Sequence, residues 1–392
     1  MSVFQSSNQK QPETQAVYLD NHATTRVDPR VAEVVLRKML IEYGNPNSVD
    51  HVFGERASDA IEKARFEVAN LLGSDSSDVH FTYGASDGIR LAIAHALACR
   101  EAKNCPLRVA ASVVEHAAVL DALSRSELRG DISVRWIDVD QYARINPSTL
   151  AEILDDGLDL LCMMSANNEV GTMYPTKKIR ELSYKSGTKM LVDATQSAAH
   201  YELSTELCDV EYVVLSGHKL YGPKGVGALV ASSSYPLSRK ALDGHEGTPD
   251  VQGIAGFGEA CRLARLEMAH DRHRISSLRD DLERRLREGL PGLVVNGDIS
   301  SRLCQNLHIS VPGTPNGAIV SRLGRKLAIS TGAACSSGAQ SSSHVLRAMG
   351  LSEDMQESAL RIGLGRFTTP AEIERAAELL LSAVAETHAA LA

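Results

Sequence analysis

Short apolar runs with strand-like composition alternate with segments of helical periodicity between residues 79 and 230. Alternation of this kind is typical of a parallel or mixed β-sheet that helices cover on both faces. The sequence therefore predicts an α/β fold. The predicted strands are Val79–Thr82, Leu107–Val113, Ile132–Ile137, Leu158–Met164, Met190–Val192, Tyr212–Leu215 and Val226–Val230.

The helices before and after this region can also be predicted. Asp28 directly precedes Pro29, and a capping residue followed by proline predicts the start of a helix over Asp28–Tyr43. A second helix is expected over Gly54–Leu72, and a long one, rich in Arg, Glu and Leu, over Ile254–Leu290.

The pattern changes after the long helix, where short strands alternate with further helices. The strands are expected at Leu293–Asn296, Asn306–Val311, Leu327–Ser330 and Arg361–Leu364. We expect a flexible N-terminal tail (1–16), a large domain (17–253) whose first residues can pack with the small domain, and a small C-terminal α+β domain with the long linking helix (254–392).

Composition excludes several classes of protein. Lys and Arg total 41 and Asp and Glu total 49, a net charge of −8, which disfavours direct nucleic-acid binding. The chain has no run of about 18 apolar residues for a membrane span and no apolar segment in its polar N-terminus for a secretory signal. Its seven cysteines form no CxxC pair, so we expect no disulfide, no metal site and a cytoplasmic location.

The chemistry is concentrated where predicted strands end. One apolar strand ends in Ser216-Gly-His-Lys219, and a glycine-rich turn follows. A lysine just past a strand end can project into a cleft, lose its proton and form a Schiff base, while Ser216 and His218 can bind phosphate. When this segment is considered alone, a surface lysine in a turn is the more common explanation.

Asp193 follows the apolar strand Met190–Val192 directly. A carboxylate at a strand end inside a cleft needs a positive partner, and a protonated pyridine nitrogen is one. The same aspartate could cap a helix that begins after it, and both roles can hold together.

Two further strand ends complete the constellation. A glycine turn and Ser86 precede a helical run from Gly88, and free backbone amides at a helix start bind phosphate. His116 follows another strand, where a histidine can stack on a ring and transfer protons. Each feature alone is more often structural.

Together these segments resemble the fold-type I pyridoxal-phosphate enzymes of the class V aminotransferase family, and among them the NifS/IscS-like cysteine desulfurases. The resemblance extends from about Val17 to Ala383. The segments that carry it are Tyr18–Thr25, Gly44–Ser48, Glu115–Val119, Asn167–Gly171, Asp193–Gln196, Ser216–Lys219, Ser330–Gly338, Ser343–Gly350 and Leu360–Gly365. It implies a large domain with a mostly parallel seven-stranded sheet and a smaller α+β domain.

The resemblance also implies a role for each matching residue. Lys219 forms the Schiff base with pyridoxal 5′-phosphate, and Asp193 pairs with its pyridine nitrogen. Arg361 binds the carboxylate of the substrate, with Asn168 nearby. The other cofactor contacts are Gln196 and Asn168 on the ring oxygen, His116 on the ring face, Ala85, Ser86, Ser216 and His218 on the phosphate, and Thr248 of the partner subunit in a homodimer.

The implied reaction removes sulfur from L-cysteine and leaves L-alanine and a persulfide on Cys335. Cys335 lies in a stretch of Ser, Gly and Ala residues, which suits an exposed mobile loop where a cysteine has no packing role. The sulfur then passes to an acceptor, either an iron–sulfur scaffold, a tRNA-thiolation protein or a DNA-phosphorothioation protein. The alternatives are a selenocysteine lyase, another class V aminotransferase-type enzyme, or a degenerate scaffold subunit.

Two places differ from the pattern of these enzymes. The segment Gly244–Thr248 is shorter and lacks an arginine, so we expect a more open cleft and slow turnover with cysteine alone. The phosphate turn lacks an amide side chain near Ile89.

Overall fold

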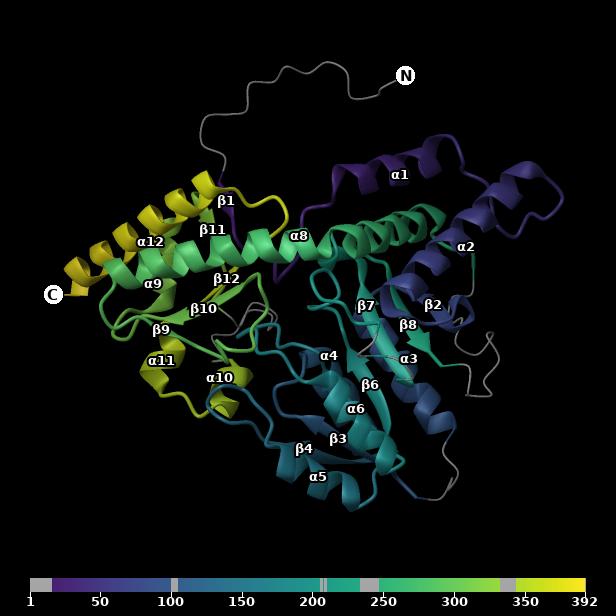
Figure 1. Ribbon diagram of the computed structural model, residues 1–392, viewed down its shortest axis with the longest axis horizontal. Helices are drawn as coiled ribbons and strands as arrows, with labels where there is room; N and C mark the ends of the chain where they lie inside the picture. The colour runs from purple at the N-terminus through teal and green to yellow at the C-terminus, as the bar shows by residue number, and fades with distance from the viewer. Residues whose placement is uncertain are drawn as a thin grey trace.

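A computed structural model describes residues 16–99, 105–204, 207, 210–232, 247–331 and 343–391, and its central feature is a seven-stranded sheet (Figure 1). The strands of this sheet lie in the order β2-β8-β7-β6-β5-β3-β4. Their bounds are β2 Val79–Thr82, β3 Leu107–Ser112, β4 Ile132–Ile137, β5 Leu160–Met164, β6 Lys189–Asp193, β7 Tyr212–Ser216 and β8 Gly227–Ala231.

The sheet is mostly parallel, as the resemblance implies. Neighbouring strands from β7 through β6, β5 and β3 to β4 pair in parallel, and β8 is antiparallel to both β7 and β2. Every strand predicted between residues 79 and 230 is confirmed, with ends that shift by at most a few residues. The carboxyl ends of the five parallel strands therefore meet at one edge.

Helices cover both faces of the sheet. Their bounds are α1 Pro29–Leu40, α2 Val52–Leu72, α3 Ala85–Ala98, α4 Ala117–Leu128, α5 Pro147–Asp155, α6 Thr176–Lys185 and α8 Val251–Gly289, with short 3-10 helices η1 Ser76–Asp78 and η2 Gly217–Lys219. On the face covered by α3 and α4, Val109 and Ala111 of β3 pack with Ile93 and Leu123. Ala110, between them in β3, faces the core formed with α2, α5, α6 and α8.

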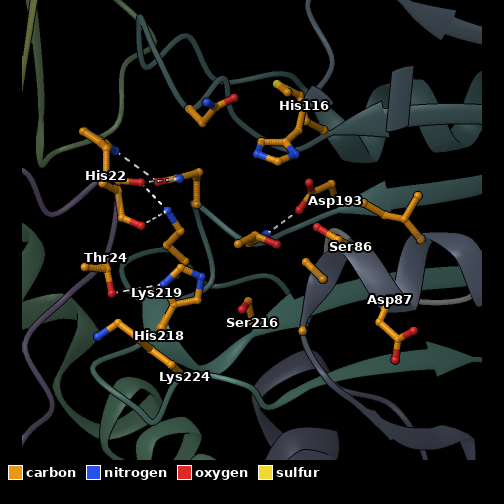
Figure 2. Close-up of a pocket in the computed structure, with 18 of the residues that line it drawn as sticks. His22, Thr24, Ser86, Asp87, His116, Asp193, Ser216, His218, Lys219 and Lys224 are labelled. Carbon is orange, nitrogen blue, oxygen red and sulfur yellow. Dashed lines mark hydrogen bonds between the residues drawn. The ribbon is translucent and has the colours of Figure 1, made fainter. Parts of the chain in front are cut away.

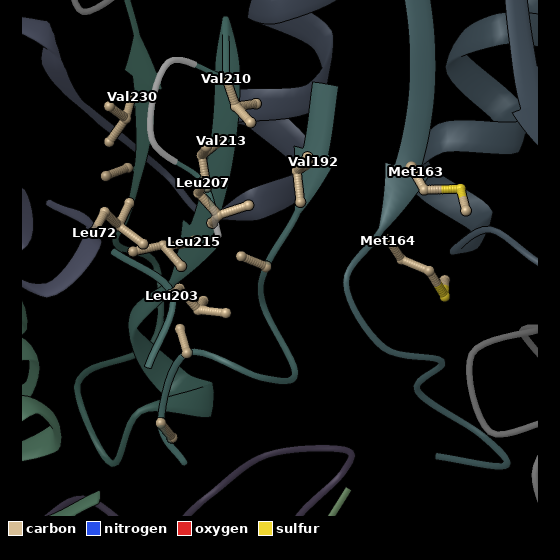
Figure 3. Close-up of a cluster of buried hydrophobic side chains, with 14 of the residues drawn as sticks. Leu72, Met163, Met164, Val192, Leu203, Leu207, Val210, Val213, Leu215 and Val230 are labelled. Carbon is tan, nitrogen blue, oxygen red and sulfur yellow. The ribbon is translucent and has the colours of Figure 1, made fainter. Parts of the chain in front are cut away.

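Figure 3 shows part of the second of these cores. Val192, Val213, Leu215 and Val230 project from neighbouring strands toward Leu72 of α2 and the segment around Leu203. Strands buried on both faces explain the near-continuous apolar runs in the sequence.

A smaller unit follows in the chain. Its strands are β9 Val294–Val295, β10 Asn306–Ser310, β11 Leu327–Ala328 and β12 Ala359–Gly363, and its helices are α9 Asn316–Leu323, α10 His344–Ala348, α11 Glu353–Glu357 and α12 Pro370–Leu391. Strand β1, Val17–Tyr18, pairs in parallel with β11, and Val17 and Leu19 are buried in the same core. Residues 17–19 thus pack with the last third of the chain.

The antiparallel sheet β12-β10-β9 has one apolar and one polar face. Leu307 and Ile309 of β10 lie opposite Ile362 and Leu360 of β12 and enter the core of the smaller unit. The alternate residues are polar and buried, and they are Asn306, His308, Ser310 and Arg361. A strand with period two can in this way bury an apolar core on one side and support a polar site on the other.

Helix α8 connects the two units. Figure 1 shows it running across the molecule between α2 and α12. Its first half buries Phe257 and Ala264 in the large core, whereas its second half buries Ile275 and Leu282 in the small one. The long helix predicted over Ile254–Leu290 is confirmed and is uninterrupted. Among the residues that the structure describes, no helix has the length and apolar character to cross a membrane.

A buried ion network fixes these units to each other. Arg366, after β12, donates to Asp28 at 3.0 Å and to Asp271 of α8 at 2.7 Å. Asp28 is the N-cap of α1, as predicted, and accepts from the Arg30 amide at 3.0 Å. Burial raises the pKa of Asp28, but the hydrogen bonds from Arg30 and Arg366 outweigh burial and lower it to about 2.

We predict that Arg366→Ala destabilises the fold by about 3–5 kcal/mol, because it leaves Asp28 and Asp271 as buried charges without this partner. The measurement is the free energy of unfolding in urea. Arg375→Ala is the matched control, since Arg375 and Glu378 form an exposed pair worth less than about 1 kcal/mol. Equal losses in the two variants would contradict the assigned role of the network.

Candidate active site

A cavity of about 530 Å³ lies at the edge where the parallel strands end (Figure 2). Its lining combines residues that follow β2, β3, β5, β6 and β7 with the segment before α1 and with Arg361 of β12. The predicted site residues that line it are Ala85, Ser86, His116, Asn168, Asp193, Gln196, Ser216, His218, Lys219 and Arg361.

Lys219 reaches the cavity from η2, the single turn that follows β7. Its Nζ donates to the backbone carbonyls of His22 and Ala23, the latter at 2.9 Å. Figure 2 shows this amine beside His22. The chain therefore holds a primary amine inside the cavity, as the strand-end argument predicts.

Asp193 ends the neighbouring strand β6 and is 9% exposed. Its Oδ1 accepts a hydrogen bond from the Thr195 amide at 3.0 Å. The predicted capping contact therefore exists, but it closes a turn because no helix begins after Asp193.

A second carboxyl group, that of Glu115, lies near Asp193. Burial raises its pKa well above the usual value, and the charge of Asp193 adds to the effect, whereas a hydrogen bond from the Met164 amide opposes it. Burial therefore disfavours the charged form of the Glu115 carboxyl.

Another part of the cavity wall suits an anion. Helix α3 begins at Ala85 after Gly84, whose φ of 141° is accessible to glycine but strained for other residues. The first amides of a helix have no intrahelical acceptor, so those of Ala85 and Ser86 can bind phosphate oxygens. The hydroxyl of Ser216 lies near, 3.5 Å from where a Cβ on Gly84 would stand.

His218 completes this part of the wall. Its Nδ1 lies 3.1 Å from Thr24 Oγ1. Burial lowers the pKa of His218 to about 4, and the charges of Lys219 and Lys224 contribute to the same shift. A neutral imidazole can therefore donate a hydrogen bond to an anion here.

His116 caps helix α4. Its Nδ1 accepts a hydrogen bond from the Ala118 amide at 3.1 Å. A neutral ring that accepts at Nδ1 carries its proton on Nε2, so His116 presents a donor at its other nitrogen.

Arg361 is 1% exposed and forms part of the cavity wall. One guanidinium nitrogen donates to Asp20 at 3.2 Å, and another donates to the Asn168 carbonyl at 3.4 Å. Among the described residues its buried Nε has no hydrogen-bond acceptor, so this donor can serve a ligand.

Several cavity residues were not predicted from the sequence. They are His22, Thr24, Asp87, Arg90, Thr195 and Lys224. The segment Tyr18–Thr25 carries part of the resemblance, but it follows no strand of the large sheet. It reaches the site because Thr25 bonds to the carbonyl of His218 and to the amide of Tyr221, each at 2.9 Å.

Two of the predicted site residues are not among those that line the cavity. Thr248 is exposed and does not line the cavity. Cys335 lies outside the described residues, as do positions 244–246 of the shortened segment.

The described residues on either side of the Cys335 segment contact the site. Ser330 pairs with Arg361 through two backbone hydrogen bonds. After the segment, Ser343 donates to Glu169 at 2.5 Å, and His344 contacts the Glu115 carbonyl at 3.0 Å.

The donor set fits pyridoxal phosphate. An amine, a carboxylate and a helix start with adjacent hydroxyls surround one cavity, and they match the cofactor's aldehyde, ring nitrogen and phosphate. The Oγ1 atom of Thr195 is buried there without a partner among the described residues, so a polar group of the ligand can satisfy it.

Four buried histidines should make the fold sensitive to acid. Burial lowers the pKa of His22, His200 and His308 from 6.5 to about 3, and that of His218 to about 4. Below pH 6.5 the unfolded chain takes up protons that the folded chain does not. The free energy of unfolding therefore decreases as the pH is lowered. Between its pKa in the folded state and pH 6.5, each histidine contributes up to ~1.4 kcal/mol per pH unit to this decrease. Above pH 6.5 these histidines contribute nothing to the pH dependence of stability.

We predict that replacing His200 and His308 together by Gln reduces this slope between pH 6 and pH 4. Both lie outside the cavity wall. The measurement is the free energy of unfolding in urea across this pH range for the wild type and the double variant. The carboxyl groups also titrate there, but they are the same in both proteins, so the difference between the two curves reports the histidines. Parallel curves for the two proteins would show that these histidines are protonated in the folded state as well.

Comparisons with known proteins agree with this geometry. The family model for class-V aminotransferases matches residues 17–376. A cysteine desulfurase IscS from Anaeromyxobacter sp. (strain Fw109-5) is 39% identical over 94% of this chain and 92% of its own. Among solved structures, a NifS-like protein has a TM-score of 0.86 at 29% identity, over 95% of this chain and all of the other. A structure described as SspA in complex with cysteine has a TM-score of 0.77 at 26% identity, over 90% and 100%.

Proposed function

Because the chain belongs to the class-V aminotransferase family, we propose that it is a pyridoxal-phosphate-dependent cysteine desulfurase. It removes sulfur from L-cysteine and yields L-alanine and a persulfide on Cys335. The observation that carries the proposal is the meeting of Lys219 and Asp193 in one cavity with an anion-binding helix start. Relatives named cysteine desulfurase support the choice of substrate within the family.

Each part of the cofactor has a matching group. Lys219 would hold it covalently through its amine, Asp193 would bind the ring nitrogen, and His116 would contact the ring. The remaining contacts are Gln196 and Asn168 at the ring oxygen, and Ala85, Ser86, Ser216 and His218 at the phosphate. Bound pyridoxal phosphate supplies an electron sink for a carbanion next to the substrate nitrogen.

Arg361 orients the substrate by binding its carboxylate. Its guanidinium is fixed by Asp20 and by the Asn168 carbonyl, and its free Nε can join a two-pronged contact to the carboxylate of cysteine. A fully buried, preorganised arginine loses little side-chain entropy when it binds. The amino acid is thereby oriented relative to Lys219 and Asp193.

Cys335 accepts the sulfur. Its thiolate attacks the substrate sulfur, an S–S bond forms, and the C–S bond breaks with its electron pair passing to carbon. Protonation of that carbon then gives alanine. The contacts of Ser330 with Arg361 and of Ser343 with Glu169 support this role, because they join the ends of the Cys335 segment to the site.

The persulfide passes to a protein acceptor. An iron–sulfur scaffold, a tRNA-thiolation protein and a DNA-phosphorothioation protein each remain open, and the location is proposed to be the cytoplasm.

Lys219→Ala and Cys335→Ser should separate the two halves of the reaction. The first should lose covalent cofactor attachment and all turnover, because it removes the amine in the cavity. The second should keep the visible absorbance of the bound cofactor and lose persulfide formation. Borohydride reduction with peptide mapping and a sulfide assay measure these outcomes. An adduct on another lysine, or wild-type sulfide release from Cys335→Ser, would refute the respective assignment.

We also propose a homodimer in which Thr248 of the partner subunit reaches the phosphate. Thr248 is exposed and outside its own cavity. Exposed apolar side chains at and after the end of α1 offer an interface, and they are Met39, Leu40, Ile41 and Tyr43.

Light scattering should give the mass of two chains, and Ile41→Glu should lower it toward one. Leu128→Glu is the control, because Leu128 is 89% exposed at the end of α4. A wild-type protein that is monomeric at micromolar concentration and fully active would rule the dimer out.

A further inference from the structure

His22 lies in the cavity wall and has no role in the scheme so far. It is 2% exposed and precedes α1 in the segment that covers Lys219. Gly363 holds the ring closely, since a Cβ there would lie 2.8 Å from its Cδ2 atom. Figure 2 shows His22 beside Lys219 in the cavity wall.

Both ring nitrogens of His22 have partners. Nδ1 lies 3.0 Å from Gln196 Oε1, and Nε2 lies 3.1 Å from the side-chain nitrogen of Asn306. The Asn306 nitrogen also donates to the Glu169 carbonyl at 2.8 Å, which can only accept. This contact identifies the Asn306 group as the amide nitrogen, so it is also the donor to His22 Nε2.

These contacts determine which ring nitrogen of His22 carries the hydrogen. A neutral ring that accepts at Nε2 carries its hydrogen on Nδ1 and donates it to Gln196 Oε1. The ring is neutral because burial, followed by the charge of Arg361, lowers the pKa of His22 to about 3. Lys219 and His200 also face the ring and act in the same direction, whereas the hydrogen bond to Gln196 opposes them.

The orientation of Gln196 follows from that of His22. Its Oε1 accepts from Nδ1, and its Nε2 donates one hydrogen to the His22 carbonyl at 3.2 Å. Because an amide nitrogen has two hydrogens, the other can be donated to a ligand in the cavity that Gln196 lines. The Gln196 backbone is held as well, since Gln305 donates to its carbonyl at 3.1 Å.

We propose that His22 is a positioning residue that orients the Gln196 amide so that Gln196 acts as a hydrogen-bond donor at the cofactor's ring oxygen. This inference rests on the proposed function, because it requires pyridoxal phosphate in the cavity. Asn306 of β10 acts one step further out by fixing the tautomer of His22. The small antiparallel sheet β12-β10-β9 thus determines, through Asn306, whether Gln196 presents its amide nitrogen or its oxygen to the cavity.

The experiment measures the visible absorbance of the bound cofactor as a function of pH. A donor at the ring oxygen stabilises its negative charge and lowers the pH at which the absorbance changes. His22→Ala removes the Nδ1 donor that fixes Gln196 Oε1 and leaves only the contact of Gln196 Nε2 with the backbone carbonyl of residue 22, so the amide can turn. The midpoint of the absorbance change should therefore rise by roughly one pH unit. His22→Asn, whose side-chain nitrogen can replace the Nδ1 donor, should stay near the wild type.

A double-mutant cycle distinguishes positioning from a structural effect. Gln196→Ala should show the same upward shift, and adding His22→Ala should shift it no further. A wild-type midpoint in His22→Ala, or a further shift in the double variant, would overturn the proposal. If His22→Ala does not fold, as thermal unfolding would show, His22→Gln replaces it, because its longer side chain can contact Asn306 but not keep the Nδ1 donor.

The same titration separates this inference from the proposed function. A wild-type protein that gains no visible absorbance with pyridoxal phosphate contradicts the proposed cofactor itself. Absorbance that appears in the wild type but has the same midpoint in all His22 variants contradicts only the positioning role.

Discussion

The parallel pairing of β7, β6, β5 and β3 is the constraint on which the site depends. The carboxyl ends of parallel strands lie at one edge of the sheet, so the topology alone brings together side chains that are far apart in sequence. Lys219 and Asp193 follow neighbouring strands, and His116 follows β3. Because the strands are buried on both faces, their register is fixed and the positions of these side chains are fixed with it.

The large sheet alone gives an incomplete cavity. The wall opposite its strand ends comes from Arg361 and from the segment that contains His22, and both depend on the smaller unit. Helix α8 belongs to both cores, and Arg366 binds Asp28 and Asp271 across them. A change in the packing of the smaller unit would therefore alter this wall of the cavity more than the strand ends that carry the lysine and the aspartate.

Local patterns were sufficient to mark candidates for the parts of the site at strand ends, but not to assign their roles. Asp193 directly follows one apolar run and Lys219 stands shortly after another, yet each residue alone is more often structural, and only the ordered match of several segments to one family implied their roles. His22 and Lys224 carry no such signal, because long-range hydrogen bonds and turn geometry bring them to the cavity. The predicted helix cap at Asp193 failed for a related reason, since the residues after it form turns against the core instead of a helix.

The charges around the cavity fit two anionic groups. Burial lowers the pKa of His22 to about 3 and that of His218 to about 4, so both rings are neutral near pH 7, and burial raises the pKa of Glu115 well above its usual value. The cations in the cavity wall are Lys219, Lys224, Arg90 and Arg361. Asp87 and Asp20 partly balance them through contacts to Arg90 at 3.4 Å and Arg361 at 3.2 Å. Arg90 belongs to α3, whose first amides can bind a phosphate, and Arg361 belongs to β12 of the smaller unit, so two anionic groups of one ligand can each meet positive charge.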